Sequence, residues 1–253
     1  MPVVELRRVT VTYHTQSGEA RAVQDLSLDV EEGEFVSLVG PSGCGKTTLL
    51  SLIAGLVRPD EGEVVVGGVP VRGPNRLVGY MMQHDHLLGW RTVLDNCLLG
   101  LEVQGRRTPA NVERVRGLLA AYGLAEFVDR FPAHLSGGMR QRAALVRTLA
   151  LDPQVLLLDE PFSALDYQTR LQLEQEVSQI LREQRRTAIL VTHDIAEAVS
   201  MADRVVVLTR RPARIKREYA IELSPRRSPV EVRELPGFSR YFRDIWRDLD
   251  VQI

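Results

Sequence analysis

The stretch that most constrains this chain is GPSGCGKTT, which occupies residues 40–48. It lies directly after the apolar run 34–39 and directly before a second apolar run, 49–54. This order predicts a strand, a glycine-rich loop and a helix. The backbone N–H groups of such a loop converge on a chain of phosphates, and glycine permits the close approach because it has no Cβ. The positive end of the helix dipole favours the same anion. We therefore predict that this loop binds the phosphates of a nucleotide.

Within the loop, the pattern G-x-x-x-x-G-K-[ST] is filled by Gly40, Gly45, Lys46 and Thr47. We expect the Lys46 ammonium to reach the β- and γ-phosphates of ATP, and the Thr47 hydroxyl to bind Mg²⁺. The other loop members predicted to contact the nucleotide are Pro41, Ser42, Gly43, Cys44 and Thr48. The alternative is a flexible Gly/Ser loop without a ligand, which the strand before and the helix after it disfavour.

Composition restricts the kind of protein that surrounds this loop. The 253 residues suffice for one large domain or two small ones. The 32 Lys and Arg nearly balance the 33 Asp and Glu, so charge gives no support to a nucleic-acid partner. With only Cys44 and Cys97, we expect no disulfide framework and a reducing compartment. No apolar run resembles a signal peptide or a membrane span, so we expect a cytosolic protein that can dock on a membrane partner.

Apolar runs and their periodicity predict an α/β fold, and the phosphate-binding loop within it indicates a P-loop NTPase core. Strands are expected at 3–13, 22–30, 34–39, 63–67, 77–82, 155–159, 188–192 and 204–209. Helices are expected at 46–56, 92–103, 110–122, 125–130, 166–186 and 195–201. The alternation of strand and helix indicates a mainly parallel sheet covered by helices, with an N-terminal antiparallel β subdomain beside it.

Two further features concern the division of the chain. The mostly helical stretch 85–150 is expected to form a subdomain inserted in the α/β core, and residues 1–225 to form one domain. Residues 226–253 are expected to be a tail with a short helix at 239–249. The apolar stripe of that helix is expected to pack on the same domain.

Two carboxylates follow the strand predicted at 155–159. Asp159 and Glu160 stand at its carboxyl end, directly after an apolar run. Beside a phosphate-binding loop, Asp159 is placed to hold Mg²⁺, directly or through water, and Glu160 to polarise an attacking water molecule. A strand that ends in Asp-Glu is common in itself, so the functional interpretation of this pair depends on the neighbouring phosphate loop.

The segment LSGGM, residues 135–139, predicts the start of a helix. Ser136 is a natural N-cap, and Gly137 and Gly138 leave backbone N–H groups accessible to an anion. An ordinary capped helix is the plain alternative. However, LSGGM followed by RQRAALVRTLALDP and VLLLDEPFSALD resembles the nucleotide-binding subunits of the ABC ATPase family, and the resemblance extends from about residue 3 to 217. The fifth residue of this signature is usually Gln. Here it is Met139, to which we assign no phosphate contact.

The resemblance implies roles for residues that would carry none alone. Tyr13 occupies the position of the aromatic that stacks on adenine, and Gln83 that of the glutamine that senses Mg²⁺ and the attacking water. His193 corresponds to the histidine that contacts the γ-phosphate. The segment 163–166, which ends in Asp166, resembles the one that crosses the dimer interface. By their sequence surroundings alone, Tyr13 and His193 would be an ordinary strand aromatic and an ordinary surface histidine.

The resemblance also implies a mechanism. In this family two copies form a homodimer around two ATP molecules, each held between Lys46 of one copy and Ser136 to Gly138 of the other. The expected catalytic residues are Lys46, Gln83, Glu160 and His193. The expected Mg²⁺ ligands are Thr47, Gln83 and Asp159. ATP binding closes the dimer, and hydrolysis lets it reopen.

The segment 79–105, together with 202–216, resembles the ATPases of nitrate, sulfonate and taurine importers. This implies integral membrane permease subunits contacted around residues 83–100, with Leu87, Leu88 and Trp90 as apolar anchors. Local packing of this loop is the alternative. It also implies an extracytoplasmic solute-binding protein and a peripheral location on the cytoplasmic face of the membrane. The solute, a sulfonate-, taurine- or nitrate-like compound or a vitamin precursor, is not encoded in this subunit.

Two other functions would account for part of these motifs. A soluble ABC ATPase of DNA repair or translation would share them all, but such proteins usually carry tandem domains or coiled-coil insertions, which this chain lacks. A small-molecule kinase would share residues 40–47, but it has no use for LSGGM or for His193. Co-purification with a membrane protein distinguishes the first alternative, and ATPase activity without an added acceptor distinguishes the second.

Overall fold

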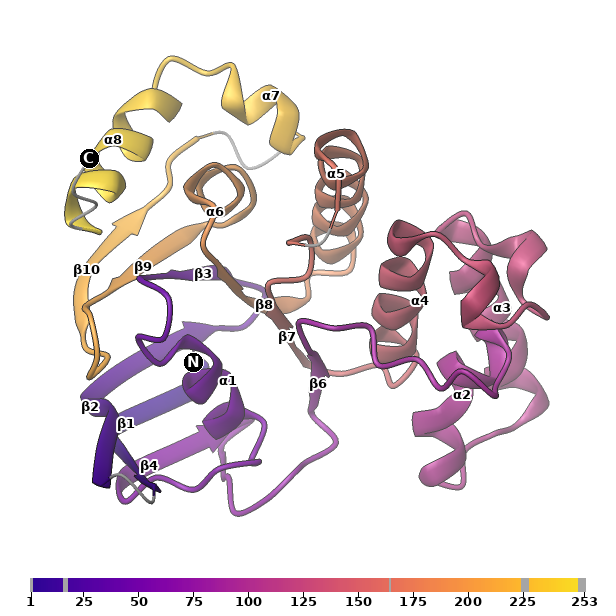
Figure 1. Cartoon of the computed structure of the whole chain (residues 1–253), viewed down its shortest axis with the longest axis horizontal. Helices are drawn as coiled ribbons and strands as arrows, with labels where there is room; N and C mark the ends of the chain where they lie inside the picture. The colour runs from indigo at the N-terminus through magenta and orange to yellow at the C-terminus, as the bar shows by residue number, and fades with distance from the viewer. Residues whose placement is uncertain (1, 16–17, 164, 224–227, 250–253) are drawn as a thin grey trace.

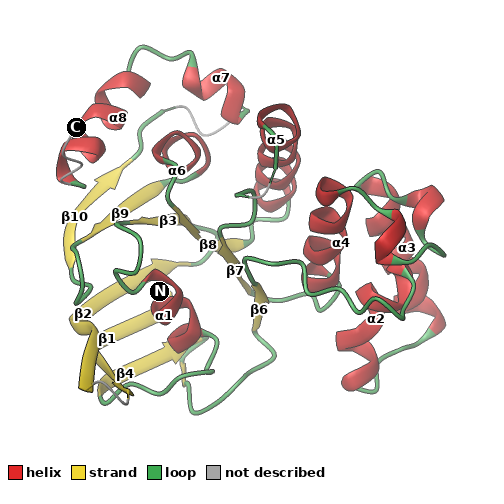
Figure 2. Ribbon diagram, in the orientation of Figure 1, coloured by secondary structure: helices red, strands yellow, loops and turns green. Residues whose placement is uncertain are grey.

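The computed structural model describes residues 2–15, 18–163, 165–223 and 228–249. It consists of two β-sheets and the helices around them (Figures 1 and 2). The smaller sheet has the strand order β2-β1-β4-β5 and is antiparallel. Its strands are β1 (Pro2–Thr15), β2 (Gly18–Glu31), β4 (Glu61–Val66) and β5 (Val69–Pro70). This sheet is the predicted N-terminal antiparallel part of the fold.

The larger sheet has the strand order β10-β9-β3-β8-β7-β6. Its strands are β3 (Phe35–Val39), β6 (Val78–Met81), β7 (Val155–Asp159), β8 (Thr187–Thr192), β9 (Arg204–Leu208) and β10 (Ile215–Ala220). All neighbours in it are parallel except β10, which pairs antiparallel with β9 at the edge. The mainly parallel sheet predicted from the sequence is thus confirmed.

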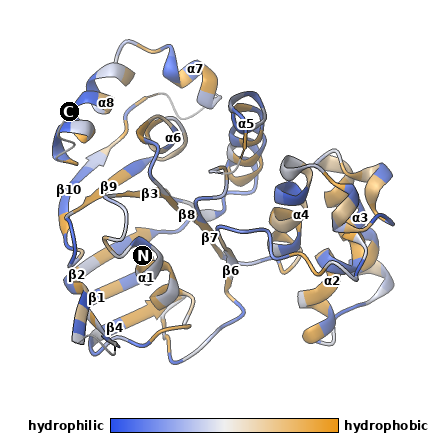
Figure 3. Cartoon of the chain, in the orientation of Figure 1, coloured by the Kyte–Doolittle hydropathy of each residue, from blue (hydrophilic) through white to orange (hydrophobic). Residues whose placement is uncertain are grey.

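The central strands of this sheet are continuously apolar because both faces are covered, and Figure 3 shows β3 and β9 in the hydrophobic colours. Along β3, Val36 and Leu38 join an apolar cluster with the smaller sheet and α1 (Lys46–Ile53). The alternate residues Phe35 and Val39 join a second cluster with the helices of the other face. The loop after β3 therefore leaves a strand that is fixed from both sides.

The remaining helices lie in two groups (Figure 1). One group is α2 (Val93–Val103), α3 (Pro109–Ala121) and α4 (Gly137–Leu149), and it stands to the side of the sheets. The other is α5 (Tyr167–Glu183), α6 (Ile195–Met201), α7 (Pro229–Arg233) and α8 (Phe238–Asp248), and here α6 contacts α5, α7 and α8. None of the helices in the described ranges combines the length and apolar character needed to cross a membrane.

Two predicted helices differ from the structure. The helix expected at 125–130 is only a 3₁₀ turn at Ala125–Phe127, with a second turn at Pro132–His134. The carbonyls of Val128 and Arg130 instead accept hydrogen bonds from the first N–H groups of α2. The helix expected at 46–56 ends at Ile53, because Gly55 adopts φ 73°.

In the C-terminal part, β10 was not predicted, because its sequence, IKREYA, is largely polar. An edge strand needs no apolar partner on its open side. The helix α7 was also not predicted, although Ser228 and Glu231 form a capping box there. The helix predicted at 239–249 is α8, and its Ile245 is fully buried against the helices of the core. The boundary predicted between residues 225 and 226 lies outside the described residues.

Candidate functional site

The carboxyl ends of four parallel strands bring the predicted catalytic residues together. The loop 40–45 follows β3, Gln83 follows β6, Glu160 follows β7 and His193 follows β8. Since parallel strands end at one edge of the sheet, these loops meet around a cleft of about 510 Å³. The cleft is lined by Tyr13, Ala22, Ser42, Gly43, Gly45, Lys46, Thr47, Thr48, Gln83, Glu160, His193 and Arg211.

The glycines of the loop have conformations that other residues avoid. Gly43 has φ 71° and Gly45 has φ 123°. A Cβ on Gly45 would lie 2.7 Å from the carbonyl oxygen of Ala22, closer than any real contact. The buried Lys46 ammonium donates to the carbonyls of Gly40 (2.7 Å) and Pro41 (3.1 Å). These bonds hold the lysine against the loop that it follows, and a compact anion fits the arrangement.

An oxygen-rich corner joins the start of α1 to the end of β7. The Thr47 hydroxyl donates to Asp159 Oδ1 at 3.4 Å, and the Tyr80 hydroxyl donates to Asp159 Oδ2 at 3.1 Å. Burial raises the pKa of the Asp159 carboxyl, while these two hydrogen bonds oppose the rise. Burial and the neighbouring Asp159 also raise the pKa of Tyr80. A hydroxyl and a carboxylate beside a phosphate-binding loop are a donor set that suits Mg²⁺.

Glu160 is the centre of a second polar group. Its Oε2 accepts from Gln83 Nε2 at 3.1 Å and lies 3.4 Å from His193 Nδ1. Glu160 itself is in the left-handed region, with φ 46°, and its N–H donates to the carbonyl of Val191 in β8. This backbone turn aims the carboxylate into the cleft rather than along the strand. A carboxylate, an amide and an imidazole thus face the same space beside the loop.

The aromatic wall of the cleft comes from the antiparallel sheet. Tyr13 is 38% exposed, and its hydroxyl lies 3.3 Å from the Thr48 hydroxyl at the start of α1. Cys44, inside the loop, is buried and does not line the cleft, and burial raises the pKa of its thiol. Gly40, Pro41 and Asp159 likewise lie behind the lining.

Three residues at the site, Ala22, Tyr80 and Arg211, were not predicted to belong to it. Tyr80 lies within β6 and reaches Asp159 only because β6 and β7 are neighbours in the sheet. Arg211 lines the cleft because the loop after β9 returns to β2, where Arg211 Nε donates to the carbonyl of Arg21. The sequence carries one signal for Arg211, its position just beyond a strand of the parallel sheet.

Four further predicted nucleotide contacts lie at the starts of α4 and α5 and not at this cleft. Ser136 is the N-cap of α4, where its hydroxyl accepts from the N–H of Met139, and Gly137 and Gly138 form the first turn. Asp166 is the N-cap of α5, and hydrogen bonds from Thr169 lower the pKa of its carboxyl. None of the four lines the cleft, and Ala164 of the segment 163–166 lies outside the described residues.

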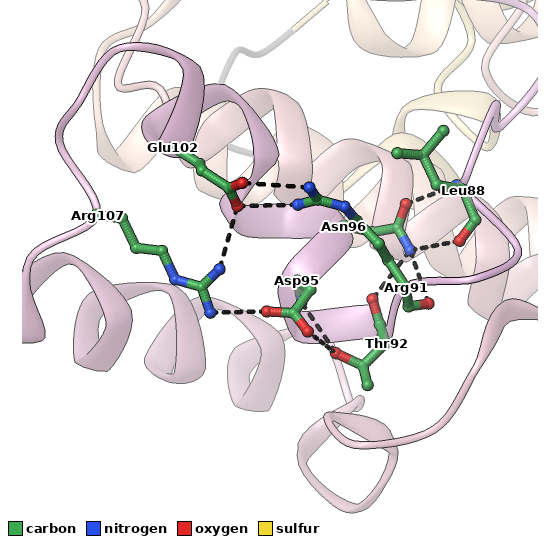
Figure 4. Close-up of polar contacts among 7 residues, drawn as sticks. All are labelled: Leu88, Arg91, Thr92, Asp95, Asn96, Glu102 and Arg107. Atoms are coloured by element: carbon green, nitrogen blue, oxygen red, sulfur yellow. Dashed lines mark hydrogen bonds and ion pairs between the residues drawn. The ribbon is translucent and has the colours of Figure 1, made fainter.

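The segment predicted to contact a permease is held by a buried asparagine (Figure 4). Asn96 in α2 is 0% exposed; its Oδ1 accepts from the N–H of Leu88, and its Nδ2 donates to the carbonyls of Leu88, Arg91 and Thr92. Trp90, in the loop so fixed, is 76% exposed. Asn96 thereby gives a rigid backbone to a loop that presents a large aromatic side chain to solvent.

Comparison with known proteins decides the family. A family model described as ABC transporter matches residues 23–163, which is more than half of the chain. The chain belongs to the ABC transporter ATP-binding family. An uncharacterized ABC transporter ATP-binding protein, YtlC of Bacillus subtilis, is 45% identical to this ABC ATPase over 99% of the chain and 96% of its own length.

Two relatives of this ABC ATPase have names that state a solute. A taurine import ATP-binding protein of Jannaschia is 38% identical over 97% of the chain, and a nitrate import ATP-binding protein of Synechocystis is 39% identical over 97%. Each is covered over 93% of its own length. Among solved structures, the cassette MJ0796, a dimer in a post-hydrolysis state bound to ADP and Pi, matches with a TM-score of 0.77. It is 31% identical and covers 87% of this chain and 99% of its own. The chain is an ATPase of this family, with ATP as its nucleotide.

Proposed function

We propose that this ABC ATPase powers the import of a small solute across a membrane. The observation that carries the proposal is the convergence of Lys46, Gln83, Glu160 and His193 on one cleft at the carboxyl edge of the sheet. The relatives named for taurine and nitrate import support a solute of the sulfonate, taurine or nitrate type, or a vitamin precursor. A soluble ABC ATPase of DNA repair or translation remains the alternative.

In this proposal, Lys46 and the loop N–H groups bind the β- and γ-phosphates, and Tyr13 stacks on the adenine. Mg²⁺ would be held by Thr47 and Asp159 with Gln83 nearby, and when bound it neutralises charge on the phosphates. Tyr80 orients the Asp159 carboxylate through the hydrogen bond from its hydroxyl.

The hydrolytic part of the proposal centres on Glu160. Its carboxylate accepts a hydrogen bond from the attacking water and orients it, while Gln83 fixes the direction of the carboxylate. His193 donates to the oxygens of the γ-phosphoryl group, where negative charge develops in the transition state. The 3.4 Å separation of His193 Nδ1 from Glu160 Oε2 supports a role for both groups at the same reacting atoms.

We further propose that Ser136, Gly137, Gly138 and Asp166 act on the nucleotide of a second copy, because they lie outside the cleft of their own chain. Permease subunits would dock on the segment 83–100, where Trp90 is exposed and Asn96 fixes the backbone. A solute-binding protein outside the membrane and a peripheral position on its cytoplasmic face complete the system. The Mg²⁺ site, these partners and the location are parts of the same proposal.

The experiment that tests the proposal replaces Glu160 by Gln. The amide keeps the shape of the side chain but cannot act as the base, so kcat should fall at least about 100-fold while ATP binding persists. Size-exclusion chromatography with ATP should then show a trapped dimer. Glu183→Gln, on the exposed face of α5, is the matched control and should keep wild-type turnover. Rapid ATP turnover by the Glu160 variant would contradict the assignment.

The solute needs a separate experiment. The ATPase, its membrane partner and its binding protein would be reconstituted in vesicles, and uptake measured for sulfonates, taurine, nitrate and vitamin precursors. Uptake that depends on ATP and is lost with Glu160→Gln would support import. If no permease of these import systems binds this chain, the result would favour the soluble ABC ATPase alternative.

A further inference from the structure

A cluster of charged groups, two of them buried and three half-buried, adjoins the turn that carries His193. It contains three carboxylates, Asp194, Glu174 and Glu197, and two guanidinium groups, Arg170 and Arg233. The cluster draws on three elements: α5 supplies Arg170 and Glu174, the start of α6 supplies Asp194 and Glu197, and α7 supplies Arg233. No part of the proposed hydrolysis uses these groups, and buried charges need a reason because their desolvation is costly.

The turn itself is closed by hydrogen bonds on both sides of His193. The Thr192 hydroxyl accepts from the N–H of Asp194 (3.0 Å) and donates to Glu197 Oε2 (3.0 Å). Asp194 Oδ1 accepts from the N–H groups of Ala196 and Glu197. The direction in which His193 points therefore depends on the position of the Asp194 side chain.

Arg170 holds that side chain from α5. Its Nη1 lies 3.4 Å from Asp194 Oδ2, on the carboxylate oxygen that is not used for capping. Glu174 is four residues further along the same helix, so it faces the same side as Arg170. Arg170 therefore has two carboxylates within the reach of one side chain.

Arg233, the last residue of α7, forms an ion pair with Glu174. Its Nη2 donates to Glu174 Oε2 at 2.6 Å, and Glu174 is 0% exposed. Four atoms of the cluster remain unmatched: within the described part of the chain, no hydrogen-bond partner is found for Glu174 Oε1, Glu197 Oε1, Arg170 Nε and Arg233 Nε. A second arrangement, in which Arg170 turns from Asp194 to Glu174, would pair Arg170 Nε with Glu174 Oε1.

We propose that Arg233 is a positioning residue for His193. Because Arg233 forms the ion pair with Glu174, Arg170 stays paired with Asp194, and this second pair fixes the turn 192–194. The helix α7 thereby supports the γ-phosphate side of the cleft without lining it. At a pH that ionises Glu174, removal of the Arg233 charge leaves a charged carboxylate that attracts Arg170, and Asp194 loses its cation. The inference rests on the proposed role of His193.

The ionisation of Glu174 gives the effect a direction with pH. Burial raises the pKa of Glu174 to about 7; the cations Arg233 and Arg170 oppose the rise, and Asp194 adds to it. Burial and Glu174 also raise the pKa of Glu197. Without Arg233 the pKa of Glu174 rises further, so the carboxyl is neutral at mildly acidic pH and attracts Arg170 only when alkaline pH ionises it.

The test compares the full-length variants Arg233→Gln and Arg233→Gln/Glu174→Gln with the wild type. At about pH 9, Arg233→Gln should lower kcat of the ATPase about fivefold with little change in KM, since the phosphate loop is intact. The loss of kcat in Arg233→Gln should become smaller below about pH 7. In the double variant, the neutral amide that replaces the Glu174 carboxylate cannot attract Arg170, so kcat should return to within about twofold of wild type.

A second measurement does not depend on catalysis. Amide hydrogen exchange of the segment 192–197 should rise in Arg233→Gln and return to the wild-type level in the double variant. Arg243→Gln, which removes an exposed cation of α8, is the control and should change neither readout. Unchanged exchange in Arg233→Gln, or a double variant as impaired as the single one, would overturn the inference. If exchange rises in Arg233→Gln and is restored in the double variant, but His193→Ala has a normal kcat, the proposed role of His193 is refuted instead.

Discussion

At the scale of single residues, the phosphate loop depends on backbone conformations that only glycine adopts easily. We predict that Gly45→Ala lowers ATP affinity at least about tenfold, because the new Cβ meets the carbonyl of Ala22 at 2.7 Å and displaces the loop. Gly105→Ala is the control. Gly105 also has a positive φ, 66°, but among the described residues no atom lies within 4 Å of its Cβ position. It should cost about 1 kcal/mol of stability and leave ATP binding unchanged. Calorimetric titration with ATP and thermal melts measure both, and equal ATP affinities for the two variants would contradict the prediction.

The hydrogen bond from Tyr80 to Asp159 gives a second prediction at this scale. Because donation by Tyr80 lowers the raised pKa of Asp159, Tyr80→Phe should raise that pKa further. If ionised Asp159 holds Mg²⁺, the acid limb of the kcat/KM profile should shift to higher pH. The variant should also lose stability as pH rises from the ordinary value of 3.8 through the folded pKa, since the folded state binds the proton more tightly there.

Tyr122→Phe is the matched control for this profile. Tyr122 is a buried tyrosine in the helical group, and burial likewise raises its pKa, but it does not line the cleft. Its variant should leave the acid limb where it is in the wild type. An acid limb that does not move in Tyr80→Phe would exclude Asp159 as the group that titrates there.

At the scale of elements, the buried Asn96 is expected to stabilise the segment around Trp90. Asn96→Ala removes the partner of one N–H and three carbonyls, so the free energy of unfolding should fall by about 2–3 kcal/mol. Urea denaturation measures this loss. Arg107→Gln is the control from the same region: its ion pairs with Asp95 and Glu102 are half exposed, and it should cost less than about 1 kcal/mol (Figure 4). Equal losses would show that Asn96 does not anchor the loop.

Elements differ in how far the sequence predicts them, for physical reasons. The strand before residues 40–48 and the helix after them were predictable, since a buried parallel strand is apolar throughout and the glycine pattern fixes the turn. The helix expected at 125–130 was wrong, because its carbonyls pair with α2, a contact that no local pattern encodes. The strand β10 was missed because four of its six residues are exposed and none is fully buried, so its sequence has no apolar run.

The same distinction holds for the site. Lys46, Asp159 and Glu160 were predictable because each belongs to a recognisable motif. Lys46 follows the glycine loop at the start of α1, and the two carboxylates stand at the end of β7. The structure brings all three to one edge of the sheet. Tyr80 and Arg211 were not, because both act across neighbours that are distant in sequence. Their contribution becomes visible only once the strand order is known.

At the scale of the whole molecule, one chain holds half of the proposed catalytic site, because Ser136 and its neighbours in α4 lie outside the cleft that contains Lys46. The ATPase rate per subunit should therefore rise with protein concentration until the dimer saturates. A steady-state assay over a dilution series measures it. A rate per subunit that stays constant down to the dilute monomer would contradict the shared site.

Mixing two inactive variants tests the sharing directly. Lys46→Ala removes the phosphate contact, and Ser136→Arg places a bulky cation on the surface that faces the partner's nucleotide. Each variant alone should be nearly inactive. In a 1:1 mixture about half of the dimers are mixed, and each mixed dimer has one site built from an intact Lys46 and an intact Ser136. About a quarter of the wild-type activity should return if the two sites act independently. If each chain completed its own site, every site would still carry one of the two substitutions, and the mixture would be as inactive as its components.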